Sequence, residues 1–154
     1  MQFFNQKTFI LLVPVLIAVL IIIFKRISGN LKRRRAEELF QNYHKDRIIY
    51  FSREVNFFGR KSEGKFSIRG NGSLILTPDQ LHFKKWIPHE DLIIPLNQIE
   101  NVEKVNSFLG KSKNRPLLKI EFKNNQGEND SAAWLLENMH SWENVLKDNL
   151  NAQT

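Results

Sequence analysis

The chain has 154 residues, no cysteine and a formal net charge of +7. This length allows one domain with its own core besides an apolar segment, and is too short for two further domains. Net charge is +8 over residues 25–69, with 13 Lys and Arg against 5 Asp and Glu, and −2 over residues 70–154, with 9 against 11. Because the larger part is slightly acidic, the composition argues against a nucleic-acid-binding domain. The lack of cysteine fits a reducing compartment.

Residues 9–24 form an apolar run without a single charge. As a helix, residues 8–24 would be about 25 Å long, close to the roughly 30 Å hydrocarbon core of a bilayer. Lys7 and the pair Lys25-Arg26 flank the run and can extend to the membrane surface. Membrane helices also tolerate a proline such as Pro14. We therefore interpret residues 8–27 as a single membrane anchor that follows a short tail, residues 1–7.

Two alternatives for the apolar run are a cleaved secretory signal and a buried helix of a soluble core. A signal carries its positive charge before the apolar segment and an Ala-x-Ala-like site after it. Here the basic residues come after the run and no such site follows. A helix in a soluble core is rarely apolar on all sides over four turns at a chain terminus. Both alternatives fit less well than an anchor.

A cluster of cations follows the anchor, and we expect it to lie at the membrane surface. Because the basic flank of a span stays cytoplasmic, the N-terminus is predicted outside and residues 25–154 in the cytoplasm. Anionic lipid attracts each such cation by about 1 kcal/mol. The cluster consists of Lys25, Arg26, Lys32, Arg33, Arg34 and Arg35.

Residues 28–46 form a basic juxtamembrane segment. Ser28-Gly29-Asn30 predicts a bend, and residues 31–44 predict a separate short helix. Its apolar face would carry Ala36, Leu39, Phe40 and Tyr43, which follow the i, i+3, i+4, i+7 spacing.

From residue 47 the composition indicates β-strands. Strands are expected over 47–57, 65–77, 81–86, 92–96 and 99–105, with a polar loop at 59–64. The sequence 77–80, Thr-Pro-Asp-Gln, predicts a turn with proline at its favoured position. The triplet 70–72, Gly-Asn-Gly, is either a tight turn or a bulge in one long strand.

The last third predicts two further strands and a helix. Residues 110–116 predict a basic loop, and residues 117–123 alternate apolar and charged side chains as a half-buried strand does. A turn at 124–127 precedes 128–136, which is either a strand or a helix. Asn138 can cap a final helix with an apolar face of Met139, Trp142, Val145 and Leu146. About seven antiparallel strands in a bent, partly open barrel with a C-terminal helical cap would occupy residues 47–150, followed by a tail, residues 151–154.

The order of these pieces resembles the GRAM and pleckstrin-homology (PH)-like family over roughly residues 47–149. The residues that carry the resemblance are 72–77 (Gly-Ser-Leu-Ile-Leu-Thr), 81–83 (Leu-His-Phe), 94–96 (Ile-Pro-Leu), Ile99, Val102, 118–120 (Leu-Lys-Ile) and Trp142. The resemblance implies a seven-stranded bent sheet capped by one helix. It also implies binding rather than catalysis, with lipid head groups or proteins as ligands. The basic residues near 60–69 differ in spacing from the lysine–arginine pattern of phosphoinositide binders.

A candidate site for an anionic ligand consists of Arg60, Lys61, Lys65, Arg69, Lys84 and Lys85. The adjacent Phe57-Phe58 is expected in the core, with insertion into a membrane interface as the alternative. The four histidines form no metal-binding motif, and neither a nucleotide loop nor a nucleophile elbow is present. We therefore expect no cofactor, no metal and no catalysis. The leading hypothesis is a membrane-anchored adaptor that binds a protein partner, and the alternative is binding of anionic phospholipid head groups through residues 60–69.

Overall fold

The computed structural model describes residues 6–152, apart from the side chains of residues 6–12, 31, 32 and 65. Its helices and strands are α1 (Gln6–Gln41), β1 (Tyr50–Arg60), β2 (Gly70–Leu76), β3 (Gln80–Lys85), β4 (Glu90–Pro95), β5 (Ile99–Phe108), β6 (Lys111–Lys123), β7 (Asn129–Leu135) and α2 (Met139–Asn151). The chain divides into two compact units between Arg34 and Arg35. The second unit therefore starts earlier than the domain boundary that the sequence suggests, at residue 47.

The N-terminal apolar segment lies in α1, a helix of 36 residues. By length and composition it is the one helix among the described residues that could cross a membrane, and none of its apolar window is buried. A signal sequence or the core helix of a soluble protein would meet the same criterion.

The predicted bend at residues 28–30 is wrong, because α1 continues through them to Gln41. A glycine inside a helix costs only about 1 kcal/mol relative to alanine. Helix propagation from the long flanking segments can offset that cost. The predicted short helix over 31–44 is therefore the last part of one longer helix.

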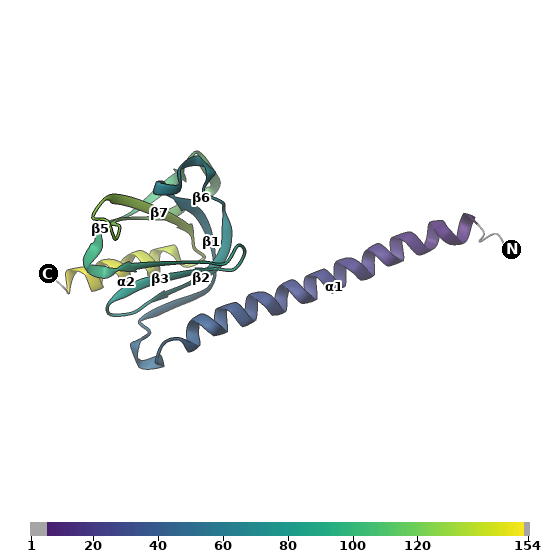
Figure 1. The fold of residues 1–154 in the computed structure, drawn as a ribbon, viewed down its shortest axis with the longest axis horizontal. Helices are drawn as coiled ribbons and strands as arrows, with labels where there is room; N and C mark the ends of the chain where they lie inside the picture. The colour runs from purple at the N-terminus through teal and green to yellow at the C-terminus, as the bar shows by residue number, and fades with distance from the viewer. Residues whose placement is uncertain (1–5, 153–154) are drawn as a thin grey trace. The chain divides into compact units, whose positions relative to one another are not determined.

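The seven strands form one antiparallel sheet in the order β4-β3-β2-β1-β7-β6-β5. The sheet curls into a half-barrel, and α2 lies against it (Figure 1). The predicted turn at 77–80 joins β2 to β3, with the Thr77 N–H donating to the Gln80 carbonyl at 3.0 Å. The predicted seven-stranded fold with a C-terminal helix is thus confirmed.

The main core fills the inside of the half-barrel and is rich in aromatic rings. Phe57 stacks on Phe83 with ring centroids 4.8 Å apart, and Trp134 packs against both rings. From α2, Trp142 is fully buried and donates its indole N–H to the Ser52 hydroxyl at 2.8 Å. The predicted apolar face of the final helix is confirmed, since Trp142 and its neighbour Leu146 belong to this core.

A second, smaller core lies on the other face of the sheet, because Phe58 points away from its neighbour Phe57. It contains Phe58, Phe108, Leu117 and Ala133. Both aromatic residues at 57 and 58 are buried, so the alternative of insertion into a membrane is wrong for this pair.

The β5–β6 hairpin corrects the prediction of a basic loop at 110–116. Strand β6 begins at Lys111, and the connection is only Leu109-Gly110. Both residues have positive φ, 50° and 73°, as a type I′ hairpin turn requires. That turn fits the right-handed twist of the strands, so pairing extends through residues that composition alone assigns to a loop.

Two ambiguous segments are resolved as strand. Residues 131–136 lie mostly in β7, which pairs with both β1 and β6. Residues 70–72 begin β2 and pair regularly with 55–57, so they form neither a turn nor a bulge, and the predicted strand does not extend back over 65–69. The irregularity lies in β1, between Ser52 and Val55. A Cβ at Gly72 would lie 2.4 Å from the Lys84 carbonyl oxygen and 2.4 Å from the Phe83 ring. Glycine is therefore required there for close packing.

The end of α1, from Arg35 onward, belongs to the domain unit. Ala36 and Leu39 are buried, and the Phe40 ring lies 5.4 Å from the Phe51 ring of β1. After the helix ends, Tyr43 contacts His82 of β3. The predicted apolar face of residues 36–43 is confirmed, and its function is to cover the sheet.

Candidate functional site

Two of the predicted anion-binding cations, Lys84 and Lys85, are buried in the sheet. Lys85 is 1% exposed, and its Nζ donates to the Ile68 carbonyl at 2.9 Å and to Glu90 Oε2 at 3.1 Å. Lys84 Nζ lies 3.8 Å from Glu38 Oε2 on α1. Both ammonium groups therefore already have acidic partners.

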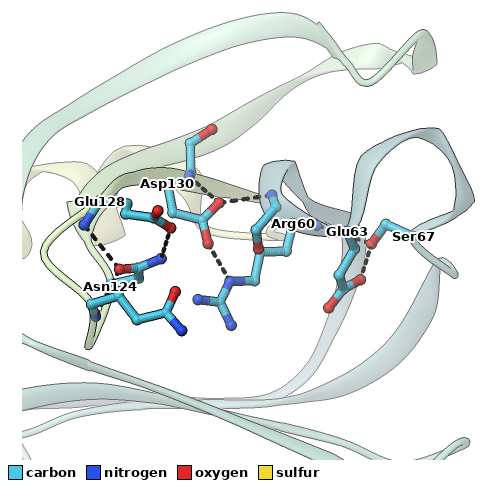
Figure 2. A network of polar contacts seen from close by, with 9 residues as sticks. Arg60, Glu63, Ser67, Asn124, Glu128 and Asp130 are labelled. Atoms are coloured by element: carbon cyan, nitrogen blue, oxygen red, sulfur yellow. Dashed lines mark hydrogen bonds and ion pairs between the residues drawn. The ribbon is translucent and has the colours of Figure 1, made fainter.

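Arg60 is held by Asp130, a buried carboxylate at the start of β7. Figure 2 shows Asp130 accepting from the Arg60 guanidinium. Asp130 also accepts the backbone N–H of Ser62 at 3.0 Å. Burial raises the pKa of Asp130, but the hydrogen bonds from Arg60, Ser62 and Ser131 outweigh it and hold that pKa below its ordinary value. Arg60 thus neutralises a charge of the protein itself.

The remaining predicted cations do not converge with Arg60. Arg69 donates to Asn56 Oδ1 at 2.9 Å, and its guanidinium lies 3.9 Å from the centre of the Phe58 ring. Lys61 is exposed, and the side chain of Lys65 lies outside the described part. Among the described side chains, the predicted set forms no common anion pocket.

The membrane-surface cluster lies along the second half of α1. The side chains of Lys25, Arg26, Arg33 and Arg34 are exposed. Arg35 is half-buried and lies 4.0 Å from Glu38. The side chain of Lys32 is outside the described residues.

A polar pocket of about 690 Å³ lies between β4 and the turn after β6. Its charged lining residues are Arg60, Lys123, Asp91 and Glu128. The turn is fixed by Asn124, whose side chain accepts the N–H of Glu128 at 3.0 Å, as Figure 2 shows. Two cations and two acids balance each other, so this pocket does not favour a polyanionic head group.

A groove of about 610 Å³ lies between the start of β5 and the C-terminal end of α2. Strand β5 is at one edge of the sheet, so one row of its backbone N–H and C=O groups has no neighbouring strand. The apolar lining residues are Leu96, Ile99, Val102 and Leu150, and the polar ones are Asn97, Glu100, Asn101, Lys147 and Asn151. Sequence reasoning missed this groove, because only the strand order reveals that β5 is an edge.

A chain of hydrogen bonds joins the end of α1 to the sheet. Gln80 Nε2 donates to the Tyr43 hydroxyl at 2.7 Å, which lies 2.8 Å from His82 Nδ1, and His82 Nε2 lies 2.8 Å from Asp91 Oδ1. Burial lowers the pKa of His82, although Asp91 acts in the opposite direction. A neutral imidazole with its proton on Nε2 satisfies every member of the chain.

Among the described residues, no group of three or more His, Asp or Glu side chains is placed to hold a metal ion.

No family model and no curated protein matches the sequence. A chain of the 8S snRNP assembly intermediate has a similar fold, with a TM-score of 0.54 and 11% identity over 70% of this chain and 85% of that chain. The DH/PH domains of PDZ-RhoGEF, solved with activated RhoA, have a TM-score of 0.49 and 12% identity over 68% of this chain and 29% of that chain. The C-terminal domain of an unknown protein from Leishmania infantum has a TM-score of 0.46 and 15% identity over 80% of this chain and 98% of that chain.

The fold is PH-like: seven antiparallel strands form a curled half-barrel that is completed by a C-terminal helix. At such identities the likeness to solved structures concerns the fold alone. The narrower assignment to the GRAM family stays a prediction.

Proposed function

We propose that this chain is a single-pass membrane protein whose PH-like domain binds an extended segment of a protein partner on the cytoplasmic side. The function is binding rather than catalysis. The observation that carries the proposal is the groove between the free edge of β5 and α2.

An exposed strand edge can accept a further strand from a partner, because its backbone groups are available for hydrogen bonds. At this groove the edge runs beside an apolar strip formed by the half-buried side chains of Ile99 and Leu150, while Val102 next to them is buried in the core. Backbone pairing would supply affinity, and pockets for alternate side chains would supply specificity. A strand edge and an apolar strip together fit an extended peptide better than a compact head group.

The alternative, binding of anionic head groups through residues 60–69, has less support. Arg60 and Arg69 are engaged with Asp130 and Asn56, and Lys85 is buried against Glu90. A phosphate would have to compete with these internal partners for the same N–H groups.

Membrane anchoring is supported by the apolar segment of α1 and by the exposed cations that follow it. An anchored domain meets its membrane partners at a high effective concentration, so a modest intrinsic affinity is sufficient.

The test is photo-crosslinking in membranes of the native cell, with a photoreactive residue at Asn101 or Lys147 in the full-length chain. Both positions line the groove. The matched control is Asp46, which is exposed in a 3-10 turn before β1. We expect one discrete protein adduct from 101 and 147 and none from 46. Adducts with lipid alone, or equal adducts from all three positions, would contradict the proposal.

A further inference from the structure

The end of α1 and the two residues after it, 35–43, lie on the face of the sheet opposite to the main core, and we call them the covering segment. Leu81 and Phe83 belong to the main core, so His82 between them points to the other face. From the covering segment, Tyr43 meets the His82 ring edge-on, with ring centroids 5.9 Å apart. The polar part of this contact is therefore centred on a titratable imidazole.

The hydrogen bonds of this contact require a neutral His82. Gln80 Nε2 donates to the Tyr43 oxygen at 2.7 Å, and the Tyr43 hydroxyl donates to His82 Nδ1 at 2.8 Å. His82 Nε2 then carries the proton and donates to Asp91 Oδ1 at 2.8 Å. Only the neutral imidazole can offer an acceptor to Tyr43.

The groups around His82 act on its charge in opposite directions. Asp91 favours the charged imidazolium, whereas Lys84 disfavours it. On β2 the opposite residue, Ile75, carries no charge. The titratable groups that surround the ring are Asp91 of β4, Lys84 of β3, Tyr43 of the covering segment and, 3.8 Å from Lys84 Nζ, Glu38 of the same segment.

Protonation of His82 converts Nδ1 from an acceptor into a donor. The imidazolium N–H and the Tyr43 O–H then face each other, so the hydroxyl must turn away and lose its partner. A proton can reach the ring from solvent, because the Asp91 side chain beside it is 38% exposed. The charged ring therefore weakens the link between the covering segment and β3.

We propose that the covering segment is a pH-dependent latch, which opens locally from the sheet and opens more often when His82 is charged. Opening would turn residues 35–49 into a longer connection between the rest of α1 and β1, and would expose Ala36 and Leu39, which are buried in the closed latch. The main core need not unfold, because it lies on the other face of the sheet. The proposal goes beyond the protein-binding groove, which is formed by β5 and α2.

The size of the effect follows from the binding of one proton. An exposed imidazole has a pKa of about 6.5, and burial lowers the pKa of His82 in the closed latch. The open state therefore binds more protons and gains population as the pH falls below about 6.5. Between pH 7.5 and 5.5 the ratio of open to closed latch should rise by at most about ten-fold.

The test is hydrogen–deuterium exchange of the full-length chain in phosphatidylcholine nanodiscs, with exchange limited by the opening equilibrium and corrected for intrinsic rates. Amides of residues 36–43 report on the latch, and amides of α2 report on the rest of the domain. We expect lower protection over 36–43 than over α2 at pH 7.5, and a rise in exchange over 36–43 of roughly two- to ten-fold at pH 5.5. Equal protection of the two segments at pH 7.5, or constant exchange of 36–43 between the two pH values, would overturn the proposal.

Three variants separate the role of His82 from general effects of pH. His82→Gln should abolish the rise, whereas His89→Gln, which removes an exposed histidine, should keep it. Asp91→Asn keeps an oxygen that can accept the Nε2 proton but removes the charge that favours the imidazolium. It should therefore enlarge the rise, because His82 in the closed latch becomes harder to protonate. A change in exchange by the same factor at both pH values in Asp91→Asn, or an unchanged rise in His82→Gln, would overturn the proposal.

Discussion

The last turns of α1 form part of the PH-like domain, so a fragment that lacks them should be markedly less stable. We compare fragments 35–154 and 45–154 and the single change Leu39→Ala in the longer one. Leu39 is 0% exposed and Ala36 is 1% exposed. Removal of residues 35–44 also breaks the Tyr43–His82 hydrogen bond, 2.8 Å long.

The magnitude follows from burial. Leu→Ala at a fully buried site costs roughly 2–5 kcal/mol, and a net hydrogen bond contributes about 0.5–1.5 kcal/mol. A change of 1 kcal/mol shifts the Tm of a domain near this size by about 4–8 °C. Leu39→Ala should therefore lower Tm by roughly 8–40 °C. Fragment 45–154 should lose at least as much.

The assay is thermal unfolding monitored by tryptophan fluorescence, since all three tryptophans lie in the domain. The control is Gln41→Ala on the same helix, which is exposed and should change stability by less than about 0.5 kcal/mol. Equal melting temperatures for the two fragments would refute the assignment of residues 35–43 to the domain.

The main core and the chain of hydrogen bonds through His82 give two further predictions. Trp142→Ala should lower the free energy of unfolding in urea by roughly 3–5 kcal/mol, because the ring is buried and its centroid lies 4.8 Å from that of Tyr50. Trp142→Phe should cost less. A wild-type urea midpoint for Trp142→Ala would contradict the packing of α2. Burial lowers the pKa of His82, so the unfolded chain binds more protons there and stability should fall as pH drops below about 6.5. Tm measured between pH 7.5 and 5.5 should fall less in His82→Gln, and identical slopes would contradict this.

The fold could be predicted from sequence because its signals are local. Alternation in 117–123 and the proline turn at 77–80 each act over a few residues. Asn138 is also correctly placed at the N-cap of the last helix, although its side chain makes no capping hydrogen bond. Together they define strand number and the C-terminal helix without knowledge of long-range contacts. The predicted basic loop at 110–116 is wrong because the hairpin turn needs only Leu109-Gly110. The polar composition of the next residues gives no sign that they form a strand.

The site could not be predicted in the same way, because its chemistry depends on distant pairs. In the sequence Lys85 has the character of a surface cation, but in the folded sheet it is buried beside Ile68 and Glu90. Arg60 finds Asp130, 70 positions away in the sequence. The net charge of a segment therefore indicates a basic region, but it gives no information on which of the cations are paired with acids of the same chain.

Anchoring and orientation are the central claim, and site-specific labelling tests them most directly. Because the chain has no cysteine, single cysteines at Asn5 and Asp148 can be probed in intact cells with a membrane-impermeant thiol reagent. Asn5 precedes the apolar segment, and Asp148 is exposed on α2. We predict labelling at position 5 and none at position 148 until the membrane is permeabilised. Labelling at 148 but not at 5, or a mature protein that lacks residues 1–24, would contradict it.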